Sequence, residues 1–516
     1  MSTLTVTDRG VSTRGTAAAG AHHQPSGHRS PFFAGQHVWF IGIGGCGMSG
    51  LARLIRNAGA TCAGSDSVPS ELTDALSRDG IPVTADQQAG RLPEECTLVI
   101  ASAAIKPDHP EMLAAGDRGI PVLSYAEALG RLQSGFTGIS IAGTHGKSTT
   151  TAMLAHVLIH AGLDPSFIVG ATCAQIGGGS RTGGALVPQT ENGTGTFSLA
   201  GKPGILLAEA CEFNRSFHHH RPTMALINNI EADHLDIYGS LDEIVKAFGE
   251  FAQLLPSSRE GGRLLIAHEG AHRREVTAGL ACEVMTFGFS PWADYQVTYS
   301  PSANRVTILR QEAALGSWVL PMPGEHMVLN TAAAAILAHW CGAPWERISE
   351  ALSTFAGVDR RMQRLGTRTL PGGGQVLVYD DYGHHPTEIE STLRALRDFI
   401  RPARLICVFQ PHQHSRTRFL LEEFANSFSH ADVVIVPHIY FVRDSEIEKT
   451  KVSAQDLVDR LRTRGVTAMH LYPFEAIVEQ LELLCKGGDL LVIMGAGPVW
   501  KVGRQFLAAS MSLHAA

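Results

Sequence analysis

The chain has 516 residues, of which 44% are hydrophobic and 18% are charged, and its formal net charge is −7. A chain of this length is expected to fold into about three domains, because single hydrophobic cores rarely grow beyond roughly 250 residues. Acidic and basic residues are interspersed, which disfavours a nucleic-acid groove or contact with an anionic membrane. An anionic substrate must therefore be held by local basic residues.

The N-terminal residues and the cysteines indicate a cytoplasmic protein. Residues 1–33 are rich in Gly, Ser, Thr, His and Ala and lack a continuous apolar stretch, so we expect a disordered tail and no secretory signal. No apolar run approaches the roughly 20 residues needed to span a bilayer. The nine cysteines are scattered without a CxxC pair, which favours free thiols in a reducing compartment.

Short apolar runs alternate with longer helical patterns along the rest of the chain. They are typical of strands buried on both faces of a parallel sheet. The runs are 37–43, 98–102, 138–143, 204–210, 224–230, 376–381, 405–410, 433–437 and 490–497. The pattern predicts a doubly wound α/β fold, repeated in three domains at 34–136, 137–357 and 358–516. The glycine-rich stretch 177–204 is expected to be a long surface loop of the middle domain.

The first glycine-rich turn is GIGGCG at residues 42–47, directly after a predicted strand. Its spacing is G-x-G-x-x-G, and Asp66 follows where a dinucleotide fold places the acid that binds a ribose. This pattern predicts a site for a nucleotide diphosphate, and read alone it favours NAD. The alternative is tight packing of a helix on a strand without a ligand.

The second glycine-rich turn is GTHGKS at residues 143–148, between a predicted strand and a predicted helix. Its spacing is two residues shorter than that of the common phosphate-binding loop, but the physical chemistry is the same. Backbone N–H groups and the helix N-terminus favour phosphate oxygens, Lys147 adds a charge, and the hydroxyl of Ser148 can bind Mg²⁺. The turn predicts a phosphate site.

Acidic and imidazole side chains follow the two strands after this turn. Such groups beside a phosphate turn are the expected ligands of Mg²⁺, although acids that cap helices are a common alternative. They are Glu209, Glu212, Glu231, Asp233, His234 and Asp236. The run His218 to His220 is expected to be a solvated or partly packed turn and not a zinc site, because three adjacent residues do not share a face.

Two polar loops of the last third also follow predicted strands. The loop DDYGHHPTE at residues 380–388 supplies acid, phenol and imidazole groups, and FQPHQHSRTR at residues 409–418 supplies imidazole and guanidinium groups. Guanidinium groups suit carboxylates and phosphates. Because ligands of such sheets bind at the carboxyl ends of strands, we expect both loops to face a site.

Together these motifs identify a family. In order along the chain, GTHGKSTT, EADHLD, GEHMVLNTAAA, DDYGHHPTE and FQPH with SRT resemble the ATP-dependent Mur ligases, and GIGGCGMSG with GSDS points to the branch that acts on UDP-N-acetylmuramate. The resemblance runs from about residue 36 to 505. It implies a Rossmann-like N-terminal domain for the UDP-sugar, a central ATPase domain and a Rossmann-like C-terminal domain that presents the amino acid.

The resemblance also implies an activity and its residues. ATP would phosphorylate the lactyl carboxylate of UDP-N-acetylmuramate, and L-alanine would attack the acyl phosphate, with Mg²⁺ as cofactor, in a monomer or homodimer. Catalytic roles would fall on Lys147, Tyr382, His384 and Arg416. ATP contacts would fall on Gly143, Thr144, His145, Gly146, Lys147, Ser148, Thr149, His326, Asn330, Arg361 and Asp381. UDP-sugar contacts would fall on Gly42, Gly44, Gly45, Gly47, Met48, Asp66 and Ser102, and metal ligands on Ser148, Glu209 and His234.

The chain departs from the family pattern at one consequential position. The family usually reads PHRxxRT where this chain has Gln413 after Pro411 and His412. A cation is thus missing where a substrate carboxylate is expected, and we expect Arg416 to bind it, with Gln413 and His412 in support. Ser148 in place of threonine keeps the hydroxyl.

Three other functions stay open at this point. A sister ligase would attach a preformed peptide to the same nucleotide sugar. An NAD-dependent dehydrogenase fused to an ATPase is a distant alternative that rests on the first glycine turn alone. A nucleotide-sensing module without catalysis is the third.

Overall fold

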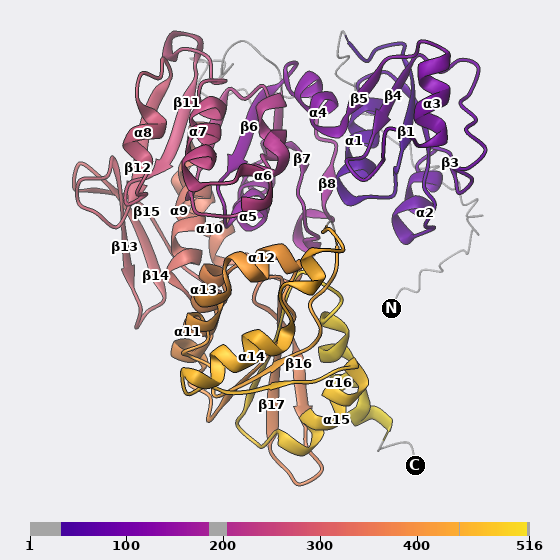
Figure 1. Ribbon diagram of the computed structural model, residues 1–516. Coiled ribbons are helices and arrows are strands. Elements are labelled where there is room, and N and C mark those ends of the chain that lie inside the picture. The colour runs from indigo at the N-terminus through magenta and orange to yellow at the C-terminus, as the bar shows by residue number, and fades with distance from the viewer. Residues whose placement is uncertain (1–31, 185–203, 443, 513–516) are drawn as a thin grey trace, which may run out of the picture.

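The computed structural model describes residues 32–184, 204–442 and 444–512. The expected disordered tail therefore lies, except for its last two residues, outside the described residues, and so does most of the 177–204 stretch. The described chain forms three sheets covered by helices, which is the predicted three-domain α/β architecture (Figure 1). The N-terminal domain lies beside the central domain, and the C-terminal domain packs below the central domain in this view.

The N-terminal domain is built on a parallel sheet in the order β3-β2-β1-β4-β5. Its elements are β1 (His37–Ile41), α1 (Cys46–Asn57), β2 (Thr61–Ser65), α2 (Glu71–Arg78), β3 (Val83–Thr84), β4 (Leu98–Ala101), α3 (Pro110–Asp117), β5 (Val122–Ser124) and α4 (Tyr125–Gln133). From β1 the chain adds β2 and β3 on one side of the sheet and then crosses to add β4 and β5 on the other side. A ligand crevice is therefore expected at the carboxyl ends of β1 and β4.

The central domain contains a ten-stranded sheet in the order β15-β14-β13-β12-β11-β10-β6-β9-β7-β8. Its strands are β6 (Thr137–Ala142), β7 (Ser166–Ile168), β8 (Ser180–Arg181), β9 (Ile205–Glu209), β10 (Met224–Ile227), β11 (Arg263–Ala267), β12 (Glu283–Gly288), β13 (Tyr295–Ser300), β14 (Arg305–Arg310) and β15 (Ala313–Val319). The strands from β13 to β7 run parallel to one another, whereas β14 pairs antiparallel with β13 and β15 towards one edge and β8 pairs antiparallel with β7 at the other.

The helices of the central domain cover both faces of this sheet. They are α5 (Lys147–His160), α6 (Leu235–Tyr238), α7 (Leu241–Ala252), α8 (Arg273–Thr277), α9 (Glu325–Trp340) and α10 (Trp345–Ser353). α5 and α9 are apolar on most sides and are buried along almost their whole length. Helices of this kind belong in the centre of a large domain.

The C-terminal domain is a six-stranded sheet in the order β16-β17-β21-β18-β19-β20, parallel except for the edge strand β16. Its strands are β16 (Gln363–Thr369), β17 (Gln375–Asp381), β18 (Leu405–Phe409), β19 (Val433–Val436), β20 (Thr467–His470) and β21 (Leu490–Met494). Its helices are α11 (Pro386–Ile400), α12 (His414–Phe419), α13 (Leu421–Asn426), α14 (Ala454–Thr463), α15 (Phe474–Leu484) and α16 (Trp500–Ser512).

The apolar runs of the sequence become the interior strands. β4, β6, β10, β18, β19 and β21 are buried at every residue, as expected for parallel strands covered on both faces. One hydrophobic cluster extends from Ile139 in the central domain to Leu490 in the C-terminal domain. Burial of apolar surface thus holds these two domains together.

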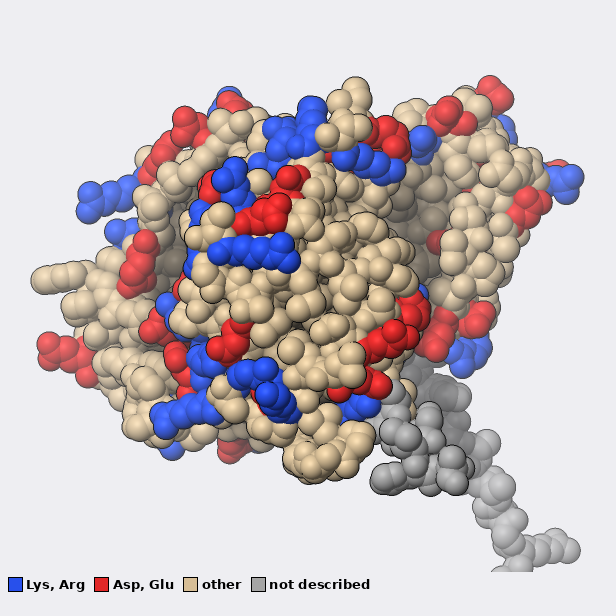
Figure 2. Space-filling view, turned by 60° about the horizontal axis from the view of Figure 1, so that its bottom comes forward, with Lys and Arg blue, Asp and Glu red and all other residues tan. Residues whose placement is uncertain are grey.

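Among the described residues, no helix is long and apolar enough to cross a bilayer. On the face shown in Figure 2, Lys and Arg side chains are interspersed with Asp and Glu. This matches the mixed charge of the sequence and leaves binding to local groups.

Candidate active site

The first glycine turn lies at the crevice of the N-terminal sheet. Gly42 has φ +77° and a Cβ there would lie 3.0 Å from that of Ser102, which follows β4. The N–H of Gly44 donates to Oδ2 of Asp66 at 2.7 Å. Four of the residues expected to bind a UDP-sugar therefore lie together. The other three form the start of α1: Gly45 at its N-cap, then Gly47 and the buried Met48.

The lysine turn lies at the carboxyl end of β6 and begins α5. Gly143 (φ +136°) and Gly146 (φ +83°) adopt conformations that favour glycine. Lys147 is the first helical residue, and its Nζ donates to the carbonyl oxygens of Gly143 and Thr144 at 2.6 and 3.0 Å. Nζ also lies 2.9 Å from Oε2 of the buried Glu212. A charged lysine is thus held above a helix N-terminus, as phosphate binding requires.

Glu212 keeps Lys147 charged. Burial alone lowers the pKa of Lys147, but the negative charge of Glu212 outweighs burial and raises the pKa above its usual value. To bind a phosphate oxygen, the ammonium group of Lys147 would have to give up part of its contact with Glu212.

The expected metal ligands lie on both sides of Lys147. Oγ of Ser148 donates to Oε2 of Glu209 at 3.1 Å. Burial raises the pKa of Glu209, so this carboxylate gains from a nearby cation. His234 has a φ of +53°. It forms a cluster with Glu212 and Asp233, in which one ligand atom from each of the three residues lies within 4.8 Å of the other two. The hydroxyl and carboxylate oxygens on the lysine turn fit Mg²⁺.

A cavity opens between the central and C-terminal domains beside this turn. Eight of the residues predicted to bind ATP line it: His145, Gly146, Ser148, Thr149, His326, Asn330, Arg361 and Asp381. Sequence reasoning missed other lining residues, among them Asn228, Asn229, Phe287 and Thr387. The two asparagines directly follow the buried strand β10, and that position was the signal that could have found them.

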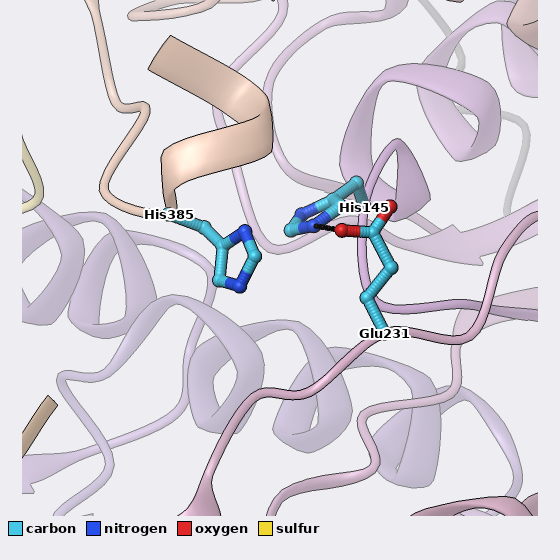
Figure 3. Close-up of side chains that lie close together, drawn as sticks. All are labelled: His145, Glu231 and His385. Carbon is cyan, nitrogen blue, oxygen red and sulfur yellow. Dashed lines mark ion pairs between the residues drawn. The ribbon is translucent and has the colours of Figure 1, made fainter. Parts of the chain in front are cut away.

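His145 connects the two domains inside this cavity. Its Nε2 lies 3.5 Å from Oε2 of Glu231 in the central domain, and its Nδ1 lies 3.3 Å from Oε1 of Glu388 in the C-terminal domain. Burial lowers the pKa of His145, but the two carboxylates outweigh burial and raise it to about 9. The ring of His385 lies 4.6 Å from that of His145 between centroids (Figure 3).

The Asp381–His384 loop begins at the same cavity, which Asp381 lines from the C-terminal sheet. Asp381 ends β17, and its carboxylate accepts the N–H groups of Met362 and Gly383; burial raises its pKa to about 6. Tyr382 stacks against the guanidinium of Arg361, 5.0 Å from the ring centroid. Burial lowers the pKa of His384 to about 3, so this imidazole is neutral.

Arg416 forms an ion pair with Asp233, a carboxylate of the protein itself. Its Nε and Nη2 donate to Oδ1 of Asp233 at 3.0 and 2.8 Å, and its Nη1 lies 3.2 Å from Nδ1 of His412. Arg418, two residues on, pairs with Glu448. The sequence predicted that Arg416 binds a substrate carboxylate, and the Asp233 contact was not foreseen. Gln413 is buried with φ +67° at the N-cap of α12.

The histidine run 218–220 has a structural role. His218 and His219 end a 3₁₀ segment (Phe213–His219), and Nε2 of His218 contacts the carbonyl oxygen of Ala247 at 2.9 Å. His220 is buried with Nδ1 2.8 Å from Oγ of Ser140, and burial lowers its pKa to about 4. This agrees with the predicted packed turn.

Comparisons with known proteins agree with the motifs. Three family models match: Mur ligase family, catalytic domain (residues 37–137); Mur ligase middle domain (141–338); and Mur ligase, glutamate ligase domain (360–497). The UDP-N-acetylmuramate–L-alanine ligase of Lachnospira eligens is 37% identical over 91% of this chain and 98% of its own. That of Desulfitobacterium hafniense is 38% identical over 91% and 99%.

Solved structures extend the likeness to the fold. The crystal structure of the UDP-N-acetylmuramate–alanine ligase of Thermotoga maritima has a TM-score of 0.69 at 26% identity and covers 92% of this chain and 99% of its own. A murein peptide ligase of Psychrobacter arcticus has a TM-score of 0.66 at 25% identity, with 92% and 98% covered. On its motifs, its three-domain fold and these relatives, the chain belongs to the Mur ligase family.

Proposed function

We propose that this protein is a UDP-N-acetylmuramate–L-alanine ligase that consumes ATP. The observation that carries the proposal is the cavity that the lysine turn shares with the Asp381–His384 loop. The cavity brings the phosphate turn next to Asp381, the acid that begins the loop with Tyr382 and His384, and a ligase needs its phosphate site next to its reacting groups. Relatives at 37 and 38% identity over nearly their whole length carry this name.

ATP is assigned to the cavity between the central and C-terminal domains. Its phosphates would lie along Gly146 and Lys147, where backbone N–H groups and the helix N-terminus favour them. His326 and Asn330 of α9 and Arg361 would contact the rest of the nucleotide. The UDP-sugar is assigned to the first glycine turn, with Asp66 at its ribose.

The reaction has two steps. The γ-phosphoryl group of ATP is transferred to an oxygen of the lactyl carboxylate, which gives an acyl phosphate and ADP. The amine of L-alanine then attacks the carbonyl carbon, and the tetrahedral intermediate expels phosphate. Lys147 stabilises the charge on the transferred phosphoryl group. Ser148, Glu209 and His234 would hold Mg²⁺, which supplies further positive charge to the phosphates when bound.

His384 and Tyr382 are assigned to the reacting groups. Nδ1 of His384 lies 3.2 Å from the carbonyl oxygen of Tyr382, which can only accept, so Nδ1 carries the proton and Nε2 a lone pair. A neutral imidazole of this tautomer accepts a hydrogen bond from the attacking amine and orients it. Arg416 is assigned to binding a substrate carboxylate, and to do so it would have to release Asp233.

The test is a phosphate-release assay with defined substrates. Purified protein is incubated with ATP, Mg²⁺ and UDP-N-acetylmuramate, and each amino acid, or a preformed tripeptide, is added separately. We expect phosphate release with L-alanine and little with the tripeptide. Release with the tripeptide alone would assign the protein to the sister ligases, and release with neither would refute a ligase. Omitting Mg²⁺, or adding EDTA, is expected to abolish release.

A further inference from the structure

Two histidines and a glutamate form a second cluster at the boundary between domains. His145 belongs to the lysine turn, Glu231 follows β10 and His385 precedes α11, so the cluster joins the central domain to the C-terminal domain (Figure 3). One ligand atom from each residue lies within 4.8 Å of the other two. His145 and His385 are not among the side chains expected to bind Mg²⁺, and Glu231 is not one of the three metal ligands that the family resemblance implies.

The spacing of the cluster suits a small metal ion. Four ligands about 2.0–2.1 Å from one ion lie about 3.3–3.4 Å from each other when the geometry is tetrahedral. Nε2 of His145 lies 3.5 Å from Oε2 of Glu231. Both ring nitrogens of His145 are buried, and neither makes a hydrogen bond among the described residues. The imidazole is therefore held by two ion-pair contacts, with Glu231 and Glu388, and not by a hydrogen bond of ordinary geometry.

The groups around the cluster orient both imidazoles as ligands. A histidine that binds metal usually donates its second N–H to a carboxylate or a backbone carbonyl. Nδ1 of His145 lies 3.3 Å from Oε1 of Glu388. Nε2 of His385 lies 3.2 Å from the carbonyl oxygen of Ala232, so Nε2 carries the proton and Nδ1 has the lone pair.

Nδ1 of His385 is free to change its partner at low cost. It accepts the N–H of Thr387 at 3.3 Å, which is long for a capping hydrogen bond. In Figure 3 one nitrogen of the His385 ring faces the ring of His145. His145 and Glu231 also line the cavity between the domains, so a fourth coordination position would open to that cavity and an ion could enter from it.

We propose that His145, Glu231 and His385 form a binding site for a divalent transition-metal ion, for which Zn²⁺ fits best. Two imidazoles and one carboxylate suit Zn²⁺, whereas Mg²⁺ prefers oxygen ligands and resists losing its water. The ion would connect the central domain to the C-terminal domain. This site is separate from the magnesium site and does not depend on the proposed ligase activity.

A proton competes with the metal at this site. An imidazole binds a metal only in its neutral form, so any proton on a ligand nitrogen must be released, and zinc affinity is expected to rise with pH.

The experiment measures zinc binding to the full-length protein by equilibrium dialysis, with Mg²⁺ in excess to fill oxygen sites and no nucleotide. Three variants are compared with the parent: His385→Asn, Glu231→Gln and Glu388→Gln. Asparagine at position 385 keeps a side-chain acceptor at the N-cap of α11 and so preserves the helix start. His218→Asn is the control, because His218 is partly buried and lies outside the cluster.

We expect the parent to bind one zinc ion per chain. In His385→Asn and Glu231→Gln the affinity for zinc should fall more than about 100-fold, and the bound ion should be lost. Glu388→Gln should weaken binding by about 10- to 100-fold, because it removes the partner of a ligand and not a ligand. His218→Asn should match the parent. Co²⁺ should give the visible absorption of a low-coordinate site in the parent, and His385→Asn should lose it.

Equal zinc affinity in the parent, His385→Asn and Glu231→Gln would overturn the proposal, as would a parent that binds no zinc in the presence of Mg²⁺. If His385→Asn fails to fold, Glu231→Gln and Glu388→Gln decide the question. Neither outcome bears on the ligase activity, because the assay contains neither ATP nor the nucleotide sugar.

Discussion

Arg416 offers the sharpest test of how the C-terminal domain takes part in the reaction. It donates two hydrogen bonds to Oδ1 of Asp233, and both side chains are less than a tenth exposed. The pair joins α12 to the segment after β10, across the boundary between domains. Arg418 lies on the same helix and pairs with Glu448, but these side chains are 33% and 15% exposed. Arg418 is therefore a matched control.

The expected losses follow from burial. Removing one partner of a buried pair leaves an uncompensated charge and costs about 3–5 kcal/mol, whereas an exposed pair contributes about 0–1 kcal/mol. If Arg416 also binds a substrate carboxylate, Arg416→Ala should lose about 2–5 kcal/mol of transition-state binding, a fall in kcat/KM of about 30-fold to several thousand-fold. Arg418→Ala should stay within about twofold of the parent.

A double-mutant cycle separates the two roles of Arg416. kcat/KM is measured for UDP-N-acetylmuramate and for alanine in Arg416→Gln, Asp233→Asn and the double variant. If Arg416 binds a substrate, Arg416→Gln should raise the KM of that substrate more than Asp233→Asn does. If the two single variants lower kcat/KM equally and the double variant loses no more, Arg416 acts only by linking the two domains through Asp233.

The assignment of this loop would be wrong if Arg416→Ala stayed within about twofold of the parent while Arg418→Ala collapsed. Gln413→Arg restores the cation of the family pattern and is expected to be tolerated or mildly beneficial.

Three further predictions concern other parts of the chain. Lys147→Ala should reduce turnover by about 10³-fold or more in a folded protein, and near-normal ligation would contradict the role of the lysine turn. UDP-N-acetylmuramate should raise the melting temperature and NAD should not; the reverse would favour a dehydrogenase. Burial raises the pKa of Glu111, which accepts hydrogen bonds from Ser65 and Trp39. Because burial favours the neutral carboxyl, Glu111 contributes most to the stability of the folded protein below the pKa of the unfolded chain, about 4.3. This stability is lost as pH rises through the raised pKa of the folded state. Glu111→Gln should therefore gain stability relative to the parent as pH rises above about 4, and a difference in melting temperature that does not change with pH would contradict this.

Much of the fold could be predicted because parallel strands covered on both faces leave a clear signal. Runs such as 138–143 and 490–497 are apolar throughout, and they became β6 and β21 in the middle of their sheets. The rule that ligands bind at the carboxyl ends of such strands then predicted that the lysine turn and the Asp381 loop face one site, and Ser148 and Asp381 do line the same cavity. That step needs only the fold class and the position of each motif.

Contacts between domains could not be predicted in the same way. Asp233 and Arg416 are 183 residues apart in the chain, and His145 and Glu388 meet only when the central and C-terminal sheets are docked. Hydrophobic periodicity specifies which side chains are buried but not how two domains are oriented. The strands at or near the edges of the central sheet, β8, β13, β14 and β15, were missed for a related reason. They are short or partly exposed and lack the continuous apolar run of a fully buried strand.

The structure relates the two glycine turns, which the sequence presented as separate signals. Gly47 of the first turn packs against the ring of Tyr125, where a Cβ would lie 3.1 Å from the nearest ring atom. The pKa of Tyr125 is raised by burial and also by the negative charge of Glu209, the carboxylate that accepts the hydrogen bond from Ser148 of the second turn. Tyr125 thus packs against the first turn and is influenced by the charge of a carboxylate at the second. A dehydrogenase would not need a phosphate turn next to its dinucleotide crevice, whereas a ligase that phosphorylates a sugar-linked carboxylate needs both sites on one surface.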